Sequence, residues 1–307
     1  MVCASLFLAA CSSIGHGVIE EARLRGFGVD SIEAGDFELA VFINDHAARA
    51  LRSRQVAATK SLLPEPVGSG RFTIRKPLHV YLGGDGRPYR EDHRRRSRDP
   101  TSIDGPLMFE LMALDPKPSR YLGRPCYNGS LGVRPCTDDL WTEARYSEDV
   151  VAAMVRGLLR LAENAGAEEL WLFGHSGGGT LAMLLAERVE AVSRVITIGA
   201  NLDTDRWIAL HGYTPLRRSM NPATRPALRD DVWQWHLVGG RDGTVPPRIV
   251  RRFIDGQPAA SGFEFPQYGH VCCWVETWPQ VLAALEADDP SLMPAHQFKF
   301  REVPRTP

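Results

Sequence analysis

One serine in this 307-residue chain lies in a setting that favours nucleophilic chemistry. Ser176 is the central residue of Gly-His-Ser-Gly-Gly (174–178), a match to the pattern G-x-S-x-G. A short apolar run at 170–173 precedes it, and leucines at helical spacing follow from 181 onward. A tight strand-to-helix turn exposes such a hydroxyl at the carboxyl edge of a sheet, where the helix N-terminus stabilises negative charge. The pattern predicts an activated serine, and the alternative is an ordinary serine in a glycine-rich turn.

Two later residues could complete the chemistry of this serine. Asp242 follows an apolar strand-like run at 235–239, and His270 follows Gly269 beyond another at 263–265. A histidine base would take the serine proton during attack and return it to the leaving group. An aspartate would hold the imidazole and stabilise its charged form. We therefore predict a Ser176, Asp242 and His270 triad, while a plain turn-forming role is the alternative for Asp242.

A glycine-rich turn after an early strand is the candidate for the oxyanion hole. The run at 78–82 is followed at once by Gly-Gly-Asp-Gly (83–86). An oxyanion hole needs close backbone approach and N–H donors from two sites. One donor is expected to be the N–H of Gly177 and the other that of Gly84 or Asp85. A simple β-turn is the alternative for this segment.

Strand-like and helix-like segments alternate along the chain, which implies a mostly parallel sheet with helices on both faces. The segment from 199 to about 231 is too short for a large lid domain. A capping-box spacing predicts that the final helix opens at Thr277. The expected strands are 35–44, 78–82, 170–173, 195–198, 235–239 and 263–265, and the expected helices include 106–114, 145–163 and 249–254.

The order of the three candidate triad residues resembles that of the α/β-hydrolase superfamily, over roughly residues 35–288. More narrowly, the chain is similar to a group of bacterial α/β-hydrolases often described as lipoproteins. That group often has an acidic residue where this chain has Gly83. The resemblance implies an α/β-hydrolase fold in a single domain at 12–289, with a polar tail at 290–307. The motifs that carry it lie at 80–86, 121–126, 174–178, 201–203 and 269–270.

The resemblance implies a serine hydrolase that cleaves carboxylic esters through an acyl-enzyme. A peptidase or amidase on the same fold is the alternative, because pocket details select the leaving group. A non-catalytic envelope lipoprotein that uses the fold as a binding scaffold is a further alternative. The expected partner is a small-molecule ester. The net charge of −1 does not favour nucleic acid, and we expect no cofactor and no metal.

The first eleven residues predict an export signal. Residues 2–10 are apolar and far too short to span a bilayer. Leu-Ala-Ala-Cys (8–11) resembles a lipobox, which implies cleavage before Cys11 and lipidation of its thiol. No Lys or Arg precedes the apolar run, unlike the usual signal. We expect a location in the bacterial cell envelope or periplasm, with a cytosolic protein as the alternative.

The cysteines outside the export signal also favour an oxidising compartment. Cys126 and Cys136 flank a short loop rich in turn residues, so a disulfide between them is sterically easy. Cys272 and Cys273 are adjacent. They could form a vicinal bridge or be two small buried residues, and the sequence leaves both interpretations open.

Overall fold

A computed structural model describes residues 13–44, 77–90, 95–101, 107–129 and 136–299 of the protein. Within these residues a nine-stranded sheet has the order β1-β2-β4-β3-β5-β6-β7-β8-β9. The pairs from β4 through β8 are parallel, while β1, β2 and β9 join antiparallel. The strands are β1 (Gly28–Ala34), β2 (Phe37–Asn44), β3 (Leu78–Leu82), β4 (Ser119–Leu122), β5 (Leu170–His175), β6 (Val192–Ile198), β7 (Trp233–Gly239), β8 (Ala260–Phe265) and β9 (His296–Lys299).

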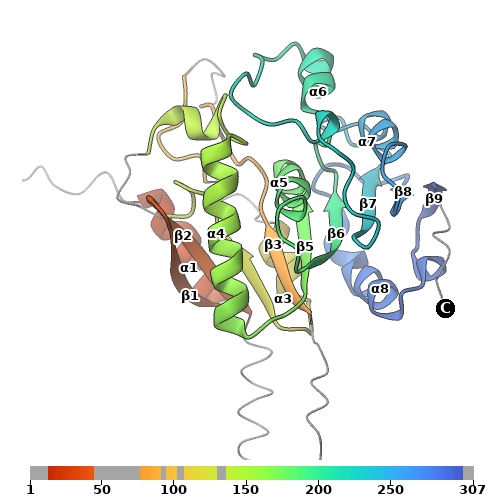
Figure 1. Cartoon of the computed structure of the whole chain (residues 1–307), viewed down its shortest axis with the longest axis horizontal. Helices are drawn as coiled ribbons and strands as arrows, with labels where there is room; N and C mark the ends of the chain where they lie inside the picture. Colours follow the sequence, from red (N-terminus) through yellow and green to blue (C-terminus); the bar gives the residue numbers. More distant parts are fainter. Residues whose placement is uncertain (1–12, 45–76, 91–94, 102–106, 130–135, 300–307) are drawn as a thin grey trace, which may run out of the picture.

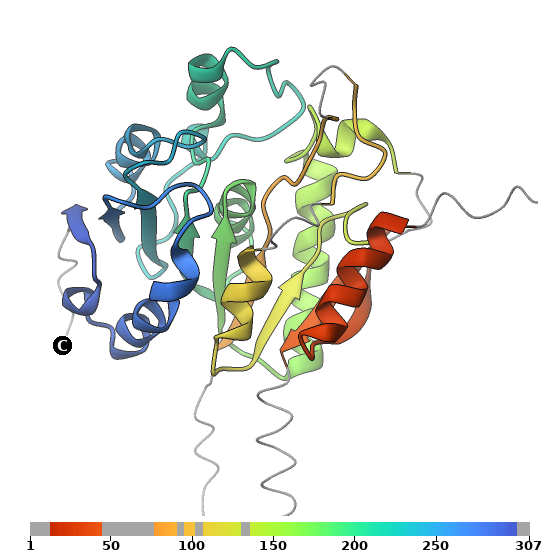
Figure 2. The same ribbon diagram turned by 180° about the vertical axis from the view of Figure 1, so that it is seen from behind.

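Helices cover both faces of the sheet, as Figures 1 and 2 show from opposite sides. One face packs against α4 (Glu148–Ala165), α5 (Gly177–Ala186) and α7 (Pro247–Ile254). The other face packs against α1 (Ser13–Leu24), α3 (Leu107–Ala113) and α8 (Trp274–Ala287). The central strands β3 and β5 are buried along their whole length, as expected of parallel strands covered on both faces. Two apolar cores therefore cover the faces of the sheet, and the loops that follow the parallel strands lie at its carboxyl edge.

Local sequence explains where the flanking helices begin and end. Ser147 caps α4 by accepting a hydrogen bond from the N–H of Val150, and Gly166 ends the helix with a φ of 61°. Asp203 caps α6 (Thr204–His211) in the same way, and Gly212 ends it with a φ of 66°. In Figure 1, α6 lies at the upper end of the sheet, where β6 leads into it.

The segment between β6 and β7 is a short insertion. Its described elements are α6 and the single 3₁₀ turn η2 (Pro222–Thr224). The prediction of a mostly parallel sheet without a large lid domain is confirmed for the part of the chain that the structure describes.

Several predicted boundaries differ from the structure. The final helix begins at Trp274 after Cys273, three positions before Thr277. The hydroxyl of Thr277 instead contacts that of Tyr268 at 2.6 Å, so the predicted capping box is wrong. The segment predicted as a polar tail from residue 290 contains η3 (Pro290–Leu292) and β9, which extends the sheet. Residues 45–63, whose content of Ala, Arg, Leu and Lys is typical of a helix, lie outside the described residues.

Among the described helices, none combines the length and the apolar character that crossing a bilayer requires.

Candidate active site

Ser176 lies in the turn that joins β5 to α5, as the sequence predicts. Its backbone has a φ of 52° and a ψ of −123°, a strained conformation for a residue with a side chain. A Cβ on Gly174 would overlap the carbonyl of Gly178, and a Cβ on Gly178 would overlap the carbonyl oxygen of Leu82. Both glycines of the G-x-S-x-G pattern are therefore required by close backbone contacts. The tight turn places Ser176 at the carboxyl end of β5, at the N-terminus of α5.

Asp242 and His270 lie together beyond the ends of β7 and β8. Oδ2 of Asp242 is 2.8 Å from Nδ1 of His270. The other oxygen, Oδ1, accepts hydrogen bonds of 2.8 Å from the N–H groups of Thr244 and Val245. The Asp242 side chain is fully buried, whereas that of His270 is 18% exposed. The loop therefore orients the carboxylate toward one imidazole nitrogen and leaves Nε2 of His270 as the atom that can take a proton.

The end of β6 connects this pair with the serine. The N–H of Ser176 donates to the carbonyl of Ile198 at 3.0 Å. The next residue, Gly199, has a φ of 50°, and a Cβ there would lie 2.9 Å from Oδ2 of Asp242 and 3.3 Å from Nδ1 of His270. One chain segment thus touches the serine backbone on one side and the Asp–His pair on the other. The three predicted residues share one edge of the sheet.

His175, which precedes the serine, supports the His270 loop. Its Nε2 donates to the carbonyl oxygen of His270 at 2.9 Å, and the two rings lie 4.6 Å apart between centroids. Burial, together with the neighbouring His270 ring, lowers the pKa of His175 to about 3. The His175 imidazole is therefore neutral at physiological pH and acts as a fixed donor rather than as a second base.

The predicted oxyanion donors lie beside the serine. A Cβ on Gly84 would be 3.3 Å from the Cβ of Ser176, which places the 83–86 turn directly against the nucleophile. The N–H groups of Gly84, Asp85 and Gly177 donate no hydrogen bond to any other described residue. Such N–H groups are available to a substrate oxygen, and the choice between Gly84 and Asp85 stays open.

At Gly83 a side chain would meet a neighbour. A Cβ at this position would overlap the hydroxyl of Tyr121. Burial raises the pKa of Tyr121 to about 12, so this hydroxyl is neutral. A side chain at position 83 would require the tyrosine to move away from the turn.

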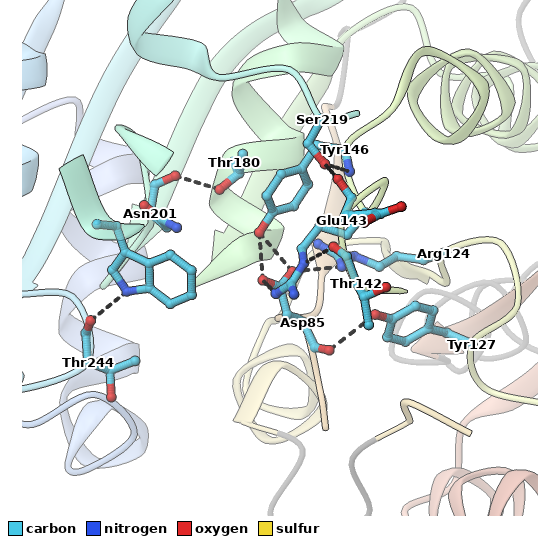
Figure 3. Close-up of polar contacts among 12 residues, drawn as sticks. Asp85, Arg124, Tyr127, Thr142, Glu143, Tyr146, Thr180, Asn201, Ser219 and Thr244 are labelled. Carbon is cyan, nitrogen blue, oxygen red and sulfur yellow. Dashed lines mark hydrogen bonds and ion pairs between the residues drawn. The ribbon is translucent and has the colours of Figure 1, made fainter. Parts of the chain in front are cut away.

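The side chain of Asp85 is held in a cluster of arginines and tyrosines (Figure 3). Its oxygens lie 2.8 Å from Nη1 of Arg124 and 2.9 Å from Nη1 of Arg145. The hydroxyl of Tyr146 donates to the same carboxylate at 2.6 and 2.8 Å, and that of Tyr127 donates to the Asp85 carbonyl at 3.1 Å. The cluster ties the 83–86 turn to two segments that are distant in sequence.

Asn201, part of a motif that supports the family resemblance, packs behind the serine. Its N–H is 3.3 Å from the carbonyl oxygen of Ser176, and its own carbonyl accepts a bond of 2.6 Å from Thr180 (Figure 3). His211, on α6, has its Nε2 2.9 Å from the carbonyl of Thr244. That contact joins the insertion to the Asp242 loop.

Cysteine placement bears on the predicted bridges. Cys126 and Cys136 lie as a disulfide pair with their Cα atoms 5.6 Å apart, and Cys272 and Cys273 lie as a vicinal pair. Cys272 is exposed and Cys273 partly exposed, so the interpretation of two small buried residues is wrong. Cys11 lies outside the described residues, and the proposed lipidation stays a prediction.

Sequence reasoning missed four polar residues of the site, namely His175, Arg124, Arg145 and Tyr146. His175 lies inside the serine motif, so the sequence alone could have indicated that it belongs to the site. The other three come from segments far from the turn that they hold, and no spacing rule connects them with it. The described residues include no group of three or more His, Cys, Asp or Glu side chains that could hold a metal ion.

Comparisons with known proteins define the fold. No family model matches the sequence, and no curated protein matches it. Among solved structures, an esterase of Pyrococcus furiosus superposes with a TM-score of 0.52 at 12% identity, over 87% of this chain and 93% of that one. The proline iminopeptidase-related protein of Thermus thermophilus gives a TM-score of 0.52 at 17% identity, over 84% and 98%. A puromycin hydrolase gives a TM-score of 0.51 at 16% identity, over 84% of this chain and 38% of that one.

The chain has the α/β-hydrolase fold. At such low identity the likeness defines the fold alone, so the activity must be argued from the site.

Proposed function

We propose that this protein is a serine hydrolase that cleaves carboxylic esters through Ser176, Asp242 and His270. The observation that carries the proposal is the strained Ser176 turn at the same sheet edge as the Asp242–His270 contact of 2.8 Å. Backbone strain of this kind persists only where the surrounding structure holds it in place, and it is concentrated at active sites. The P. furiosus esterase with the same fold supports the ester class of substrate.

In the proposed reaction each residue has a distinct task. Nε2 of His270 takes the proton of the Ser176 hydroxyl as its oxygen attacks the ester carbonyl, and then gives that proton to the leaving alkoxide. Asp242 holds the imidazole and stabilises its charged form. The N–H of Gly177 and that of Gly84 or Asp85 stabilise the oxyanion, each contributing about 3–4 kcal/mol. Water then hydrolyses the acyl-enzyme by the same route in reverse.

Covalent labelling tests the nucleophile directly. We expect a fluorophosphonate probe to add once to the folded wild-type protein and not to Ser176→Ala, as measured by intact mass. A folded wild-type protein that gains no adduct would refute the assembled triad and favour the non-catalytic binding scaffold. Equal labelling of both proteins would refute Ser176 as the nucleophile.

A peptidase or amidase is the second candidate, because one structural neighbour is described as proline iminopeptidase-related. Both reactions use the same triad, and the pocket selects the leaving group. Steady-state kinetics on matched p-nitrophenyl esters and aminoacyl p-nitroanilides separates the two. We expect kcat/KM to be much larger for the esters, and comparable values would favour the amidase.

We also propose that the protein resides in the bacterial envelope, anchored through lipidated Cys11, with a Cys126–Cys136 disulfide. Metabolic labelling with a palmitate analogue should mark the wild-type protein and not Cys11→Ala. Thiol alkylation before and after reduction, followed by mass measurement, should show that Cys126 and Cys136 react only after reduction. The absence of lipid from the full-length protein would refute the anchor.

A further inference from the structure

The carboxylate of Asp85 touches both sides of the proposed oxyanion hole. Asp85 belongs to the 83–86 turn, which supplies one N–H donor. A Cβ on Gly177, which supplies the other donor, would overlap Oδ1 and Cγ of Asp85 and meet the hydroxyl of Tyr146. The side chain therefore lies directly on the backbone of Gly177. A displacement of this carboxylate would therefore disturb the contact between the 83–86 turn and Gly177.

Three side chains, those of Arg124, Arg145 and Tyr146, contact the carboxylate in that place. The side chains of Arg124 and Arg145 are 5% and 6% exposed and contact different oxygens of Asp85. Arg145 is itself held by a 2.7 Å bond from its Nε to the carbonyl of Thr142. Arg124 lies over the rings of Tyr127 and Tyr146, 5.3 and 5.4 Å from their centroids. Both guanidiniums are buried and charged, so they attract the carboxylate, Arg145 through a hydrogen bond of 2.9 Å and Arg124 as an ion pair.

The charge of the cluster suits a position beside a developing anion. A lone carboxylate here would repel an oxyanion. Burial alone would raise the pKa of Asp85, but Arg124 and Arg145 outweigh it, and with the Tyr146 hydrogen bond they lower the pKa to about 2. One carboxylate and two guanidiniums give the cluster a net positive charge. The Asp85 side chain can thus hold the 83–86 turn in place without adding net negative charge to the site.

We propose that Asp85 is a positioning residue, which uses its ion pairs with Arg124 and Arg145 to fix the spacing of the oxyanion donors on the 83–86 turn and on Gly177. This inference rests on the proposed serine hydrolase function. It extends the role of Asp85 from a candidate backbone donor to a side chain that sets the geometry of the hole.

Kinetics of Asp85→Asn tests the proposal, because asparagine keeps the shape and removes the ion pairs. Loss of a whole oxyanion donor costs about 10²–10³ in kcat, so misplacing one should cost about 10- to 100-fold. We expect KM for a p-nitrophenyl ester to change less than about threefold, since the hole acts on the transition state. The midpoint of the acidic limb of the kcat/KM–pH profile should not move, because the Asp242–His270 pair is untouched.

Tyr146→Phe is the second variant, for the case that Asp85→Asn folds poorly. It keeps the ring under Arg124 and removes both hydroxyl contacts to the carboxylate. We expect a smaller loss of kcat, about 5- to 20-fold, with the same unchanged KM and pH midpoint. The matched control is Arg218→Gln, which removes a 2.5 Å ion pair with Asp139 outside the cluster. Its kcat should equal that of the wild type.

The outcomes separate this inference from the function on which it rests. If wild-type protein neither reacts with the fluorophosphonate nor cleaves esters, the proposed function fails. If the wild type is active and both variants keep its kcat when folded, the positioning role of Asp85 is refuted. A shift of the pH midpoint, or a rise in KM that accounts for the loss, would also refute it, because the substitutions would then act through the base or through substrate binding.

Discussion

Neutralising Asp85 should weaken the folded state by an amount that depends on pH. The ordinary pKa of 3.8 falls to about 2 in the folded protein, because the arginine charges outweigh the effect of burial. A difference of nearly two units corresponds to about 2 kcal/mol of stability. The Asp85 side chain is only 15% exposed, so solvent screens this interaction little. Asp85→Asn also leaves two buried guanidiniums with less compensation, and breaking such a pair costs about 3–5 kcal/mol.

The sign of the pH dependence follows from the lowered pKa. The stabilisation is fully present above pH 3.8 and is lost as the pH falls through about 2. Urea unfolding of wild type and Asp85→Asn should therefore differ by about 2–5 kcal/mol at pH 7, and the gap should narrow between pH 4 and pH 2. Asp231→Asn is a suitable control, because its 3.0 Å pair with Arg229 is exposed and should contribute less than about 1 kcal/mol.

Two results would refute this reasoning. Equal unfolding free energies for wild type and Asp85→Asn at pH 7 would mean that the ion pairs contribute nothing. A gap that stayed constant from pH 7 to pH 2 would mean that the loss comes from packing rather than from the charge of Asp85.

Three further predictions concern the triad, the serine turn and the disulfide between Cys126 and Cys136. Asp242→Asn should lower kcat for ester hydrolysis about 10³-fold or more, because the amide no longer holds the required His270 tautomer, and a loss below about tenfold would contradict the triad. Gly178→Ala should destabilise the protein by about 1–3 kcal/mol in thermal melts, because the added Cβ would overlap backbone carbonyls. Gly256→Ala is the control: its Cβ would meet only one contact, at 3.6 Å, so this variant should melt like the wild type. Cys126→Ser should lower the free energy of unfolding by about 3 kcal/mol in oxidising buffer, since the disulfide spans ten positions, and should not change it in reducing buffer. Equal losses of stability in both buffers would exclude the disulfide as the cause.

The sequence predicted the central strands and the serine turn because their signals are local. Buried parallel strands are continuous apolar runs, and a strand-to-helix turn with two glycines has few structural uses. The strand β4 escaped prediction because only the first and last of its four residues are buried. The start of α8 was misplaced because Cys273 caps it without a side-chain hydrogen bond, so the usual cap pattern pointed elsewhere.

The Asp85 cluster could not be predicted from spacing at all. Its members come from the turn after β3, from the loop after β4 and from the segment before α4, and only the folded sheet brings them together. A buried arginine beside a carboxylate leaves no periodic trace in the sequence, since its partner is chosen by tertiary contact. The triad is different, because each member sits in a recognisable turn after its own strand.

The antiparallel strand β9 has a consequence for how this protein behaves toward other copies of itself. β8 would otherwise end the parallel sheet with a free row of backbone donors and acceptors, a template for pairing with another chain. β9 covers that row, and it is held there by Phe298, whose ring occupies the space over Gly262 and lies 4.4 Å from the guanidinium of Arg251. The edge at this end of the sheet is then a strand of only four residues, whereas the opposite edge is β1, with seven. Such a short edge offers few backbone groups for pairing with another copy of the chain at this end of the sheet.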